Sequence, residues 1–173
     1  MQKHWSRRDA IRALGLSLGS ATLPFSSWAV DEHQHPILLP DKKISLDKPI
    51  SAITCGAGNR GNVYGGYALQ YPDQLDIIGV AEPIPLRNER YCKKHNISAE
   101  NSFVTWEDVF KRPKFADAII ITTPDNLHYG PCMKALAMGY NVLLEKPISP
   151  SEKECREILA LAKKTGRIVA VCH

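Results

Sequence analysis

The chain has 173 residues, which suits one ordinary domain with room for part of a second. Hydrophobic residues make up 44% and charged residues 23%, so a wholly disordered chain or a collagen-like repeat is excluded. Residues 1–29 hold four basic residues against one acidic residue, so most of the formal net charge of +4 lies there. The remaining body is nearly neutral and gives no reason to expect a nucleic-acid partner. No run of 18 uninterrupted apolar residues occurs, so we expect no stable membrane span.

Residues 1–29 have the layout of a signal peptide. A basic start is followed by a mildly apolar stretch over residues 13–25 and by Ser-Trp-Ala at 27–29, a small-x-small ending. The arginine pair at 7–8 resembles a twin-arginine signal, although Ala10 stands where that signal often has Phe. The alternative is an amphipathic N-terminal helix. We expect an exported, periplasmic or extracytoplasmic protein that uses the twin-arginine export machinery, which carries folded proteins.

Residues 30–49 are polar and contain three prolines, so they are predicted to form a linker. His33 and His35 could be two metal ligands. Neither a cysteine nor a carboxylate cluster lies beside them, so we interpret them as linker residues and predict no metal site.

From residue 50 onward, short apolar runs alternate with amphipathic stretches. Strands are predicted at residues 50–55, 75–81, 102–104, 116–122, 141–145 and 168–172. Helices are predicted at residues 61–71, 85–95, 107–110, 127–138 and 151–165. The alternation predicts an α/β fold, a doubly wound parallel sheet covered on both faces, and a single domain at residues 50–173.

The five cysteines include no C-x-x-C pair, so neither a zinc site nor a disulfide framework is predicted. Cys55, Cys155 and Cys172 fall at apolar positions and are predicted to be buried thiols. Within the last helix, Cys155, Ile158, Leu159 and Ala162 share one face, which we expect to pack on the sheet.

Residues 56–61 follow the first predicted strand and read Gly-Ala-Gly-Asn-Arg-Gly, a G-x-G-x-x-G pattern. The pattern is weak alone, but here it leaves a strand and opens a helix within a βαβ unit. Gly56 would permit the tight turn, Gly58 would let the backbone approach a pyrophosphate, and Gly61 would let the helix pack closely on the strand. Free N–H groups at the helix start favour a phosphate. A Rossmann-type dinucleotide site is indicated; the alternative is a tight turn without a ligand.

Glu82 ends the second predicted strand, 21 residues after Gly61. A dinucleotide site places an acid there to accept hydrogen bonds from ribose hydroxyls. A carboxylate also repels a 2′-phosphate, so NAD is favoured over NADP, although Arg87 could neutralise such a phosphate. A surface glutamate without function is the alternative.

Two further motifs follow the fourth and fifth predicted strands. Residues 122–128 read Thr-Thr-Pro-Asp-Asn-Leu-His, and residues 145–147 read Glu-Lys-Pro after the stretch Ala-Leu-Ala-Met-Gly-Tyr-Asn-Val at 135–142. Together with the glycine loop, they make residues 48–173 resemble the N-terminal half of the glucose–fructose oxidoreductase/inositol dehydrogenase (Gfo/Idh/MocA) family. The resemblance implies an NAD-dependent oxidoreductase that transfers hydride between nicotinamide and a sugar, polyol or related hydroxyl compound.

The resemblance also implies cofactor-binding residues in the glycine loop and beyond the second and fourth strands. Asn59 and Arg60 would lie against the pyrophosphate, and Glu82 would hold the adenosine ribose. The residues that would line the cofactor beyond the fourth strand are Thr123, Pro124, Asn126 and His128. For His128, the alternative is a role in capping or packing at a helix start.

Glu145 and Lys146 would lie near the nicotinamide ribose, according to the same resemblance. Lys146 would stand between cofactor and substrate as a catalytic residue, in a Lys-Pro bond that is often cis in the family. Hydride leaves a carbinol carbon only if the hydroxyl proton is accepted or the alkoxide is stabilised. A positive, partly desolvated lysine would hold that oxygen; the alternative is a solvated loop lysine.

In the family, a larger C-terminal α/β domain binds the substrate and supplies further catalytic residues and much of the oligomer contact. That domain is absent from these 173 residues. In the family, the chain continues past the last predicted strand to an arginine a few residues later, whereas the sequence here stops at His173. We therefore hypothesise a fragment or truncated product of an exported oxidoreductase whose full-length relatives are homo-oligomers. An NAD-dependent glycosidase with the same half-fold and a non-catalytic NAD-binding module are the alternatives.

Overall fold

A computed structural model describes residues 46–172 of the chain. Its strands are β1 (Ile50–Cys55), β2 (Leu75–Ala81), β3 (Ser102–Phe103), β4 (Ala118–Ile121), β5 (Asn141–Leu144) and β6 (Val169–Val171). Its α-helices are α2 (Asn59–Gln70), α3 (Pro85–His95), α4 (Trp106–Val109), α5 (Tyr129–Ala137) and α6 (Glu152–Thr165). Short 3-10 turns span Ala99–Asn101 and Asp125–Leu127. The predicted signal peptide and most of the predicted linker lie outside the described residues.

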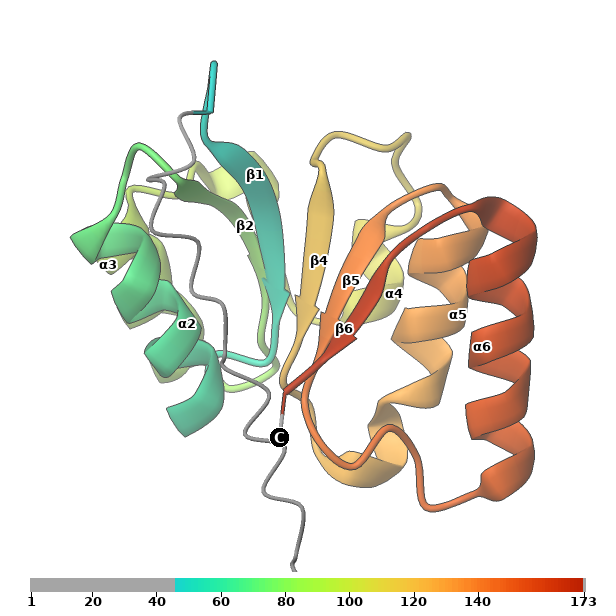
Figure 1. The fold of residues 1–173 in the computed structure, drawn as a ribbon. Coiled ribbons are helices and arrows are strands. Elements are labelled where there is room, and N and C mark those ends of the chain that lie inside the picture. Colours follow the sequence, from blue (N-terminus) through green and yellow to red (C-terminus); the bar gives the residue numbers. More distant parts are fainter. Residues whose placement is uncertain (1–45, 173) are drawn as a thin grey trace, which may run out of the picture. The chain divides into compact units, whose positions relative to one another are not determined.

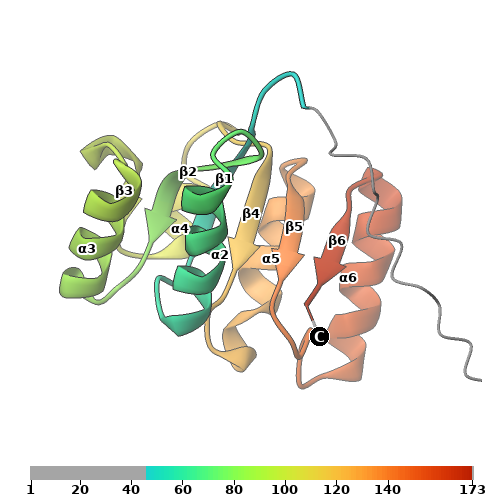
Figure 2. The same cartoon turned by 60° about the vertical axis from the view of Figure 1, so that its left-hand side comes forward.

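The strands form one parallel sheet in the order β3-β2-β1-β4-β5-β6. Helices α2 and α3 cover one face, and α5 and α6 cover the other (Figures 1 and 2). The chain winds outward from β1 to β3 and then returns to place β4 on the other side of β1. The predicted doubly wound α/β fold is therefore confirmed, and its topological switch point lies between β1 and β4.

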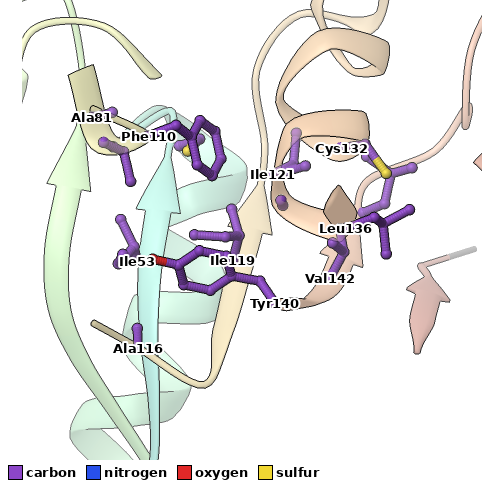
Figure 3. Packing of buried hydrophobic residues seen from close by; sticks show 14 of the residues in the cluster. Ile53, Ala81, Phe110, Ala116, Ile119, Ile121, Cys132, Leu136, Tyr140 and Val142 are labelled. Carbon is purple, nitrogen blue, oxygen red and sulfur yellow. The ribbon is translucent and has the colours of Figure 1, made fainter. Parts of the chain in front are cut away.

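Apolar side chains on both faces of the sheet explain why these strands are central. In β4, the β-branched run Ile119, Ile120 and Ile121 is buried throughout, as a strand covered by helices on both sides requires. Successive residues of β1 face opposite layers: Ala52 packs in the cluster beneath α2 and α3, and Ile53 packs in the cluster beneath α5. Figure 3 shows the second cluster, in which Cys132, Leu136 and Tyr140 pack with residues of β1, β4 and β5.

The helix ends follow local sequence signals. Ser151 caps α6 by accepting a hydrogen bond from the backbone N–H of Glu154, and Gly166 ends the helix at a φ of 63°. Pro85 opens α3, as its fixed backbone angle favours. Among the described residues, no helix has the length and apolar character needed to cross a bilayer.

The predicted bounds agree with β1, β2 and α3, and the other elements shift by a few residues. α5 begins at Tyr129 because residues 125–127 form a separate 3-10 turn after Pro124. α2 begins at Asn59, two residues earlier than predicted, so the helix start lies inside the glycine loop.

Three predictions of burial were wrong. Leu159 is 55% exposed, and Cys155 and Cys172 are only partly buried. All three residues lie near the edge strand β6, which has only one neighbouring strand. Of the residues of α6, only Ile158 and Ala162 are buried. Besides Cys55, the buried thiol is Cys132, on the covered face of α5.

Candidate functional site

The glycine loop joins β1 to α2 at the carboxyl edge of the sheet, beside the switch point (Figure 1). Gly56 has a φ of +99°, and a Cβ there would lie 2.7 Å from the carbonyl oxygen of Thr122. A Cβ on Gly61 would collide with the carbonyl oxygen of Gly56. Both positions therefore require glycine for the turn and the close packing, as predicted.

Gly58 faces open space instead. The nearest atom to a Cβ built there is Nη1 of Arg87, 3.9 Å away. Gly58 is also the N-cap of α2, so the cap has no side chain to accept hydrogen bonds from the first-turn amides. Helix α6, by contrast, is capped by its own Ser151. The first turn of α2 carries no acidic residue either, so its amides and its dipole fit a bound pyrophosphate.

Thr122, at the end of β4, reaches across the switch point to the loop. Its hydroxyl donates to the carbonyl oxygens of Gly56 at 2.6 Å and of Cys55 at 3.2 Å. This contact fixes the first turn of the loop from the neighbouring strand. Sequence reasoning missed the role, although the position directly at a strand end was a usable signal.

Glu82 is buried at the end of β2 with 4% of its surface exposed. One carboxylate oxygen accepts from the backbone N–H of Ala57 at 2.7 Å, and the other accepts from the N–H of Ile84 at 3.0 Å. The acid therefore holds the glycine loop in place, and each oxygen keeps a further lone pair for a ribose hydroxyl.

Two clefts run along this edge and share Arg60, Thr122 and Thr123. The first, of about 680 Å³, lies over the glycine loop and the end of β2. Predicted residues that line it are Gly56, Gly58, Asn59, Arg60, Glu82, Thr123 and Pro124. The second, of about 530 Å³, lies over β5 and brings together Arg60, His128, Glu145 and Lys146. An elongated ligand with two halves fits such a pair of clefts at a switch point.

Gly61 and Asn126 are the predicted residues outside both linings. Gly61 is buried beneath the loop, where it serves packing. Asn126 is exposed in the 3-10 turn after β4. Its predicted contact with the cofactor stays a prediction.

Glu145 lies directly after β5 and is 5% exposed. Its Oε1 accepts from Nε of Arg60 at 2.5 Å and from the hydroxyl of Tyr64 at 2.6 Å. Burial by itself raises the pKa of Glu145, but the hydrogen bonds from Tyr64 and Arg60 and the charge of Arg60 outweigh it, so its pKa lies below the ordinary value. Tyr64 was not predicted; its signal is its position one helical turn after Arg60.

Lys146 donates its backbone N–H to Oε2 of Glu145 at 3.2 Å and precedes a cis bond to Pro147, as the resemblance implied. Its side chain lines the second cleft but is exposed. The sequence predicted a partly desolvated lysine, but residues 46–172 leave the side chain of Lys146 in contact with solvent. The reason is that Lys146 follows the end of β5, at the open edge of the sheet.

His128 is wholly buried between the two loops that border the second cleft. Its Nδ1 lies 2.7 Å from the carbonyl oxygen of Pro147, and its Nε2 lies 2.9 Å from that of Thr123. Carbonyl oxygens only accept, so a neutral ring donates to one of them and an imidazolium donates to both. The ring thus ties the loop after β4 to the loop after β5; its predicted contact with the cofactor stays a prediction.

The fold and this edge define a Rossmann-type dinucleotide-binding domain. Residues 42–173 match the family described as "Oxidoreductase family, NAD-binding Rossmann fold" (GFO_IDH_MocA). The chain belongs to this Gfo/Idh/MocA oxidoreductase family, as the sequence motifs predicted.

Two relatives of the chain are named as an oxidoreductase and a dehydrogenase. The chain is 36% identical over 138 residues to the uncharacterized oxidoreductase YfiI of Bacillus subtilis, covering 74% of this chain and 35% of that protein. It is 27% identical over 118 residues to scyllo-inositol 2-dehydrogenase (NADP(+)) IolW of the same species, covering 68% and 31%. The chain therefore spans about a third of the length of these relatives.

Solved structures show the same fold. The NAD-binding oxidoreductase from Klebsiella pneumoniae superposes with a TM-score of 0.61 at 27% identity, covering 72% of this chain and 34% of that one. The WlbA dehydrogenase from Bordetella pertussis, solved with NADH and UDP-GlcNAcA, superposes with a TM-score of 0.66 at 19% identity, covering 73% and 35%.

Proposed function

We propose that this chain is the cofactor-binding half of an exported NAD-dependent oxidoreductase that acts on a hydroxyl carbon of a sugar, polyol or related compound. The observation that carries the proposal is the pair of clefts at the switch point, which share Arg60, Thr122 and Thr123 as lining residues. One cleft opens on the uncapped first turn of α2, and the other opens on Lys146. Family membership and the dehydrogenase IolW among its relatives support the oxidoreductase activity. IolW is named for NADP(+), so the preference for NAD rests on the position of Glu82.

The first cleft would hold the adenosine and pyrophosphate half. The amides of Asn59 and Arg60 donate to the pyrophosphate, and Gly58 lets the backbone come close to it. Glu82 accepts from the ribose hydroxyls and its charge opposes a 2′-phosphate. NAD is therefore favoured over NADP, with exposed Arg87 as the opposing charge in the same cleft.

The second cleft would hold the nicotinamide half, which supplies the hydride acceptor when bound. The ammonium group of Lys146 donates a hydrogen bond to the substrate oxygen. The ammonium group would stabilise the alkoxide that forms as the hydroxyl proton passes to solvent. The alkoxide would then become a carbonyl as the hydride leaves its carbon for the nicotinamide. The carboxylate of the neighbouring Glu145 accepts a hydrogen bond from the backbone N–H of Lys146, which restrains the backbone that carries the lysine side chain.

We also propose that the substrate is a polyol or sugar and that the whole protein forms a homo-oligomer. The scyllo-inositol dehydrogenase among the relatives and the UDP-GlcNAcA in the WlbA structure support a polyol or sugar substrate. A further α/β domain of the kind the resemblance implies would hold it and would form the homo-oligomer contacts.

Isothermal titration of the purified chain with NAD⁺, NADH, NADP⁺ and ATP tests the proposal. We expect both forms of NAD to bind, NADP⁺ to bind more weakly, and ATP to bind weakest because it lacks the nicotinamide half. A chain that binds none of the dinucleotides contradicts the proposal. A chain that binds ATP as tightly as NADH contradicts the assignment of the second cleft.

A further inference from the structure

The Glu145 carboxylate is held by two side chains of helix α2, on the other side of the switch point. Arg60 and Tyr64 both donate to Oε1, at 2.5 and 2.6 Å, while Oε2 accepts from the backbone N–H of Lys146 at 3.2 Å. Glu145 is 5% exposed, so these bonds lie in a place of low dielectric, where each is stronger than at the surface.

Tyr64 also orients Arg60. The guanidinium carbon of Arg60 lies 5.5 Å from the centroid of the Tyr64 ring, and Nη2 donates to the Tyr64 hydroxyl at 3.4 Å. The side chain of Arg60 is 52% exposed, so the tyrosine ring is the surface that limits where this long side chain can lie. Tyr64 therefore contacts both members of the ion pair.

The Tyr64 hydroxyl is a donor at neutral pH. Burial raises the pKa of Tyr64 well above its ordinary value, and hydrogen bonds with Cys172 and Glu145 raise it further, while Arg60 lowers it. A protonated phenol beside a carboxylate forms a charge-assisted bond with a defined direction.

We propose that Tyr64 is a positioning residue for the nicotinamide half of the site. Together with Arg60 it holds Glu145, and through Glu145 it holds the backbone of Lys146 and the wall of the second cleft. The inference rests on the proposed function, since it takes the second cleft as the nicotinamide site. Tyr64 lies outside the lining of that cleft, so it acts through Glu145 and not by contact with the ligand.

The test compares NADH with ADP, which carries the adenosine and pyrophosphate but lacks the nicotinamide riboside. Tyr64→Phe removes the hydroxyl and keeps the ring beneath Arg60. We expect it to weaken NADH binding about five- to tenfold, a part of what one charge-assisted hydrogen bond contributes, and to change ADP binding less than about twofold. The measurements are calorimetric titrations of the full chain with each probe.

Tyr67→Phe is the matched control. Tyr67 lies on the same helix, and its hydroxyl also donates to a side chain, Oε1 of Gln74 at 2.5 Å, but it is exposed and lines neither cleft. We expect unchanged binding of both probes. The melting temperature of each variant shows whether it is folded.

A double-mutant cycle distinguishes positioning from general loss of structure. If Tyr64 acts through Glu145, Tyr64→Phe has less than half of its effect on NADH binding in a Glu145→Gln background. Equal effects in the two backgrounds overturn the inference, as does an unchanged ratio of NADH to ADP affinity in Tyr64→Phe. Failure of the unaltered chain to bind NADH overturns the proposed function and this inference with it. If the unaltered chain binds NADH but the Tyr64→Phe results differ from those expected, only the inference is overturned.

Discussion

The carboxylate of Glu82 accepts a hydrogen bond from the backbone N–H of Ala57, 2.7 Å away, across the gap between β2 and the glycine loop. The residue predicted to hold the adenosine ribose therefore also fixes the loop that would hold the pyrophosphate. Loss of the acid should affect the two halves of the first cleft together.

Glu82→Gln should weaken NAD binding and reduce the preference for NAD over NADP. An amide can face only one of the two backbone N–H groups with its oxygen, and it lacks the charge that opposes a 2′-phosphate. We expect NADH affinity to fall about tenfold, in line with the loss of one hydrogen bond to a charged group. Titration with both cofactors checks this. Glu89→Gln, at an exposed site on α3, is the control, and an unchanged NAD/NADP ratio in Glu82→Gln contradicts the role.

Gly58→Ala should leave the fold intact and weaken dinucleotide binding at least tenfold. The added Cβ meets no protein atom closer than 3.9 Å, so it projects into the space proposed for the pyrophosphate. Gly66→Ala is the matched control, since Gly66 lies on α2, the helix that Gly58 caps, with nothing within 4 Å of its Cβ, and lines neither cleft. Melting temperature and NADH titration check the pair. If both variants bind alike, the pyrophosphate does not lie over Gly58.

Thr122→Val should lower both stability and NADH affinity, because the Gly56 carbonyl loses its 2.6 Å hydrogen bond. We expect a loss of about 1 kcal/mol in the free energy of unfolding. Thr165→Val removes a hydroxyl that donates to the carbonyl of Leu161 at the end of α6, and Thr165 lines neither cleft. That control should lose stability alone. Urea unfolding and NADH titration separate the two effects.

The ion pair of Arg60 with Glu145 should stabilise the fold at neutral pH and lose this effect in acid. The pKa of Glu145 is lower in the folded chain than the ordinary unfolded value of about 4.3. Its contribution is therefore present above that unfolded value and is lost as the pH falls through the folded-state pKa. Arg60→Gln should consequently cost more stability at pH 7 than at pH 3, as measured by urea unfolding.

The control for this pH dependence is Arg156→Gln. Arg156 and its partner Glu152 lie on α6 with side chains 77% and 79% exposed, so the pair is screened and should contribute little at either pH. If Arg60→Gln lowers the free energy of unfolding by the same amount at pH 3 and pH 7, the assigned ion pair is contradicted.

The twin-arginine signal predicted from the sequence can be tested through its arginine pair at residues 7–8. Changing Arg7 and Arg8 together to Lys should retain the chain in the cytoplasm at its full length, because that pathway reads the arginines themselves and not their charge. Arg12→Lys should leave export unchanged. Cell fractionation followed by mass determination checks both, and export of the double variant contradicts the predicted twin-arginine signal.

The elements and the glycine loop could be predicted from the sequence because their causes are local. The apolar runs at residues 50–55 and 75–81 and the proline at residue 85 each specify their own backbone, and the structure confirms them. The bounds of α5 were less accurate, since the 3-10 turn over Asp125–Leu127 separates residues that the apolar pattern joined.

The sequence by itself determined the α/β fold class, the glycine pattern at residues 56–61 and the order in which Glu82, Thr123 and Lys146 follow their strands. These depend on spacing and turn chemistry over a few residues. Only the tertiary structure decided that Thr122 meets Gly56, that Tyr64 and Arg60 converge on Glu145, 81 and 85 residues away, and that Leu159 is exposed. The physical reason is that strand order and register bring distant segments together, and no local pattern encodes which strand becomes the neighbour of β1.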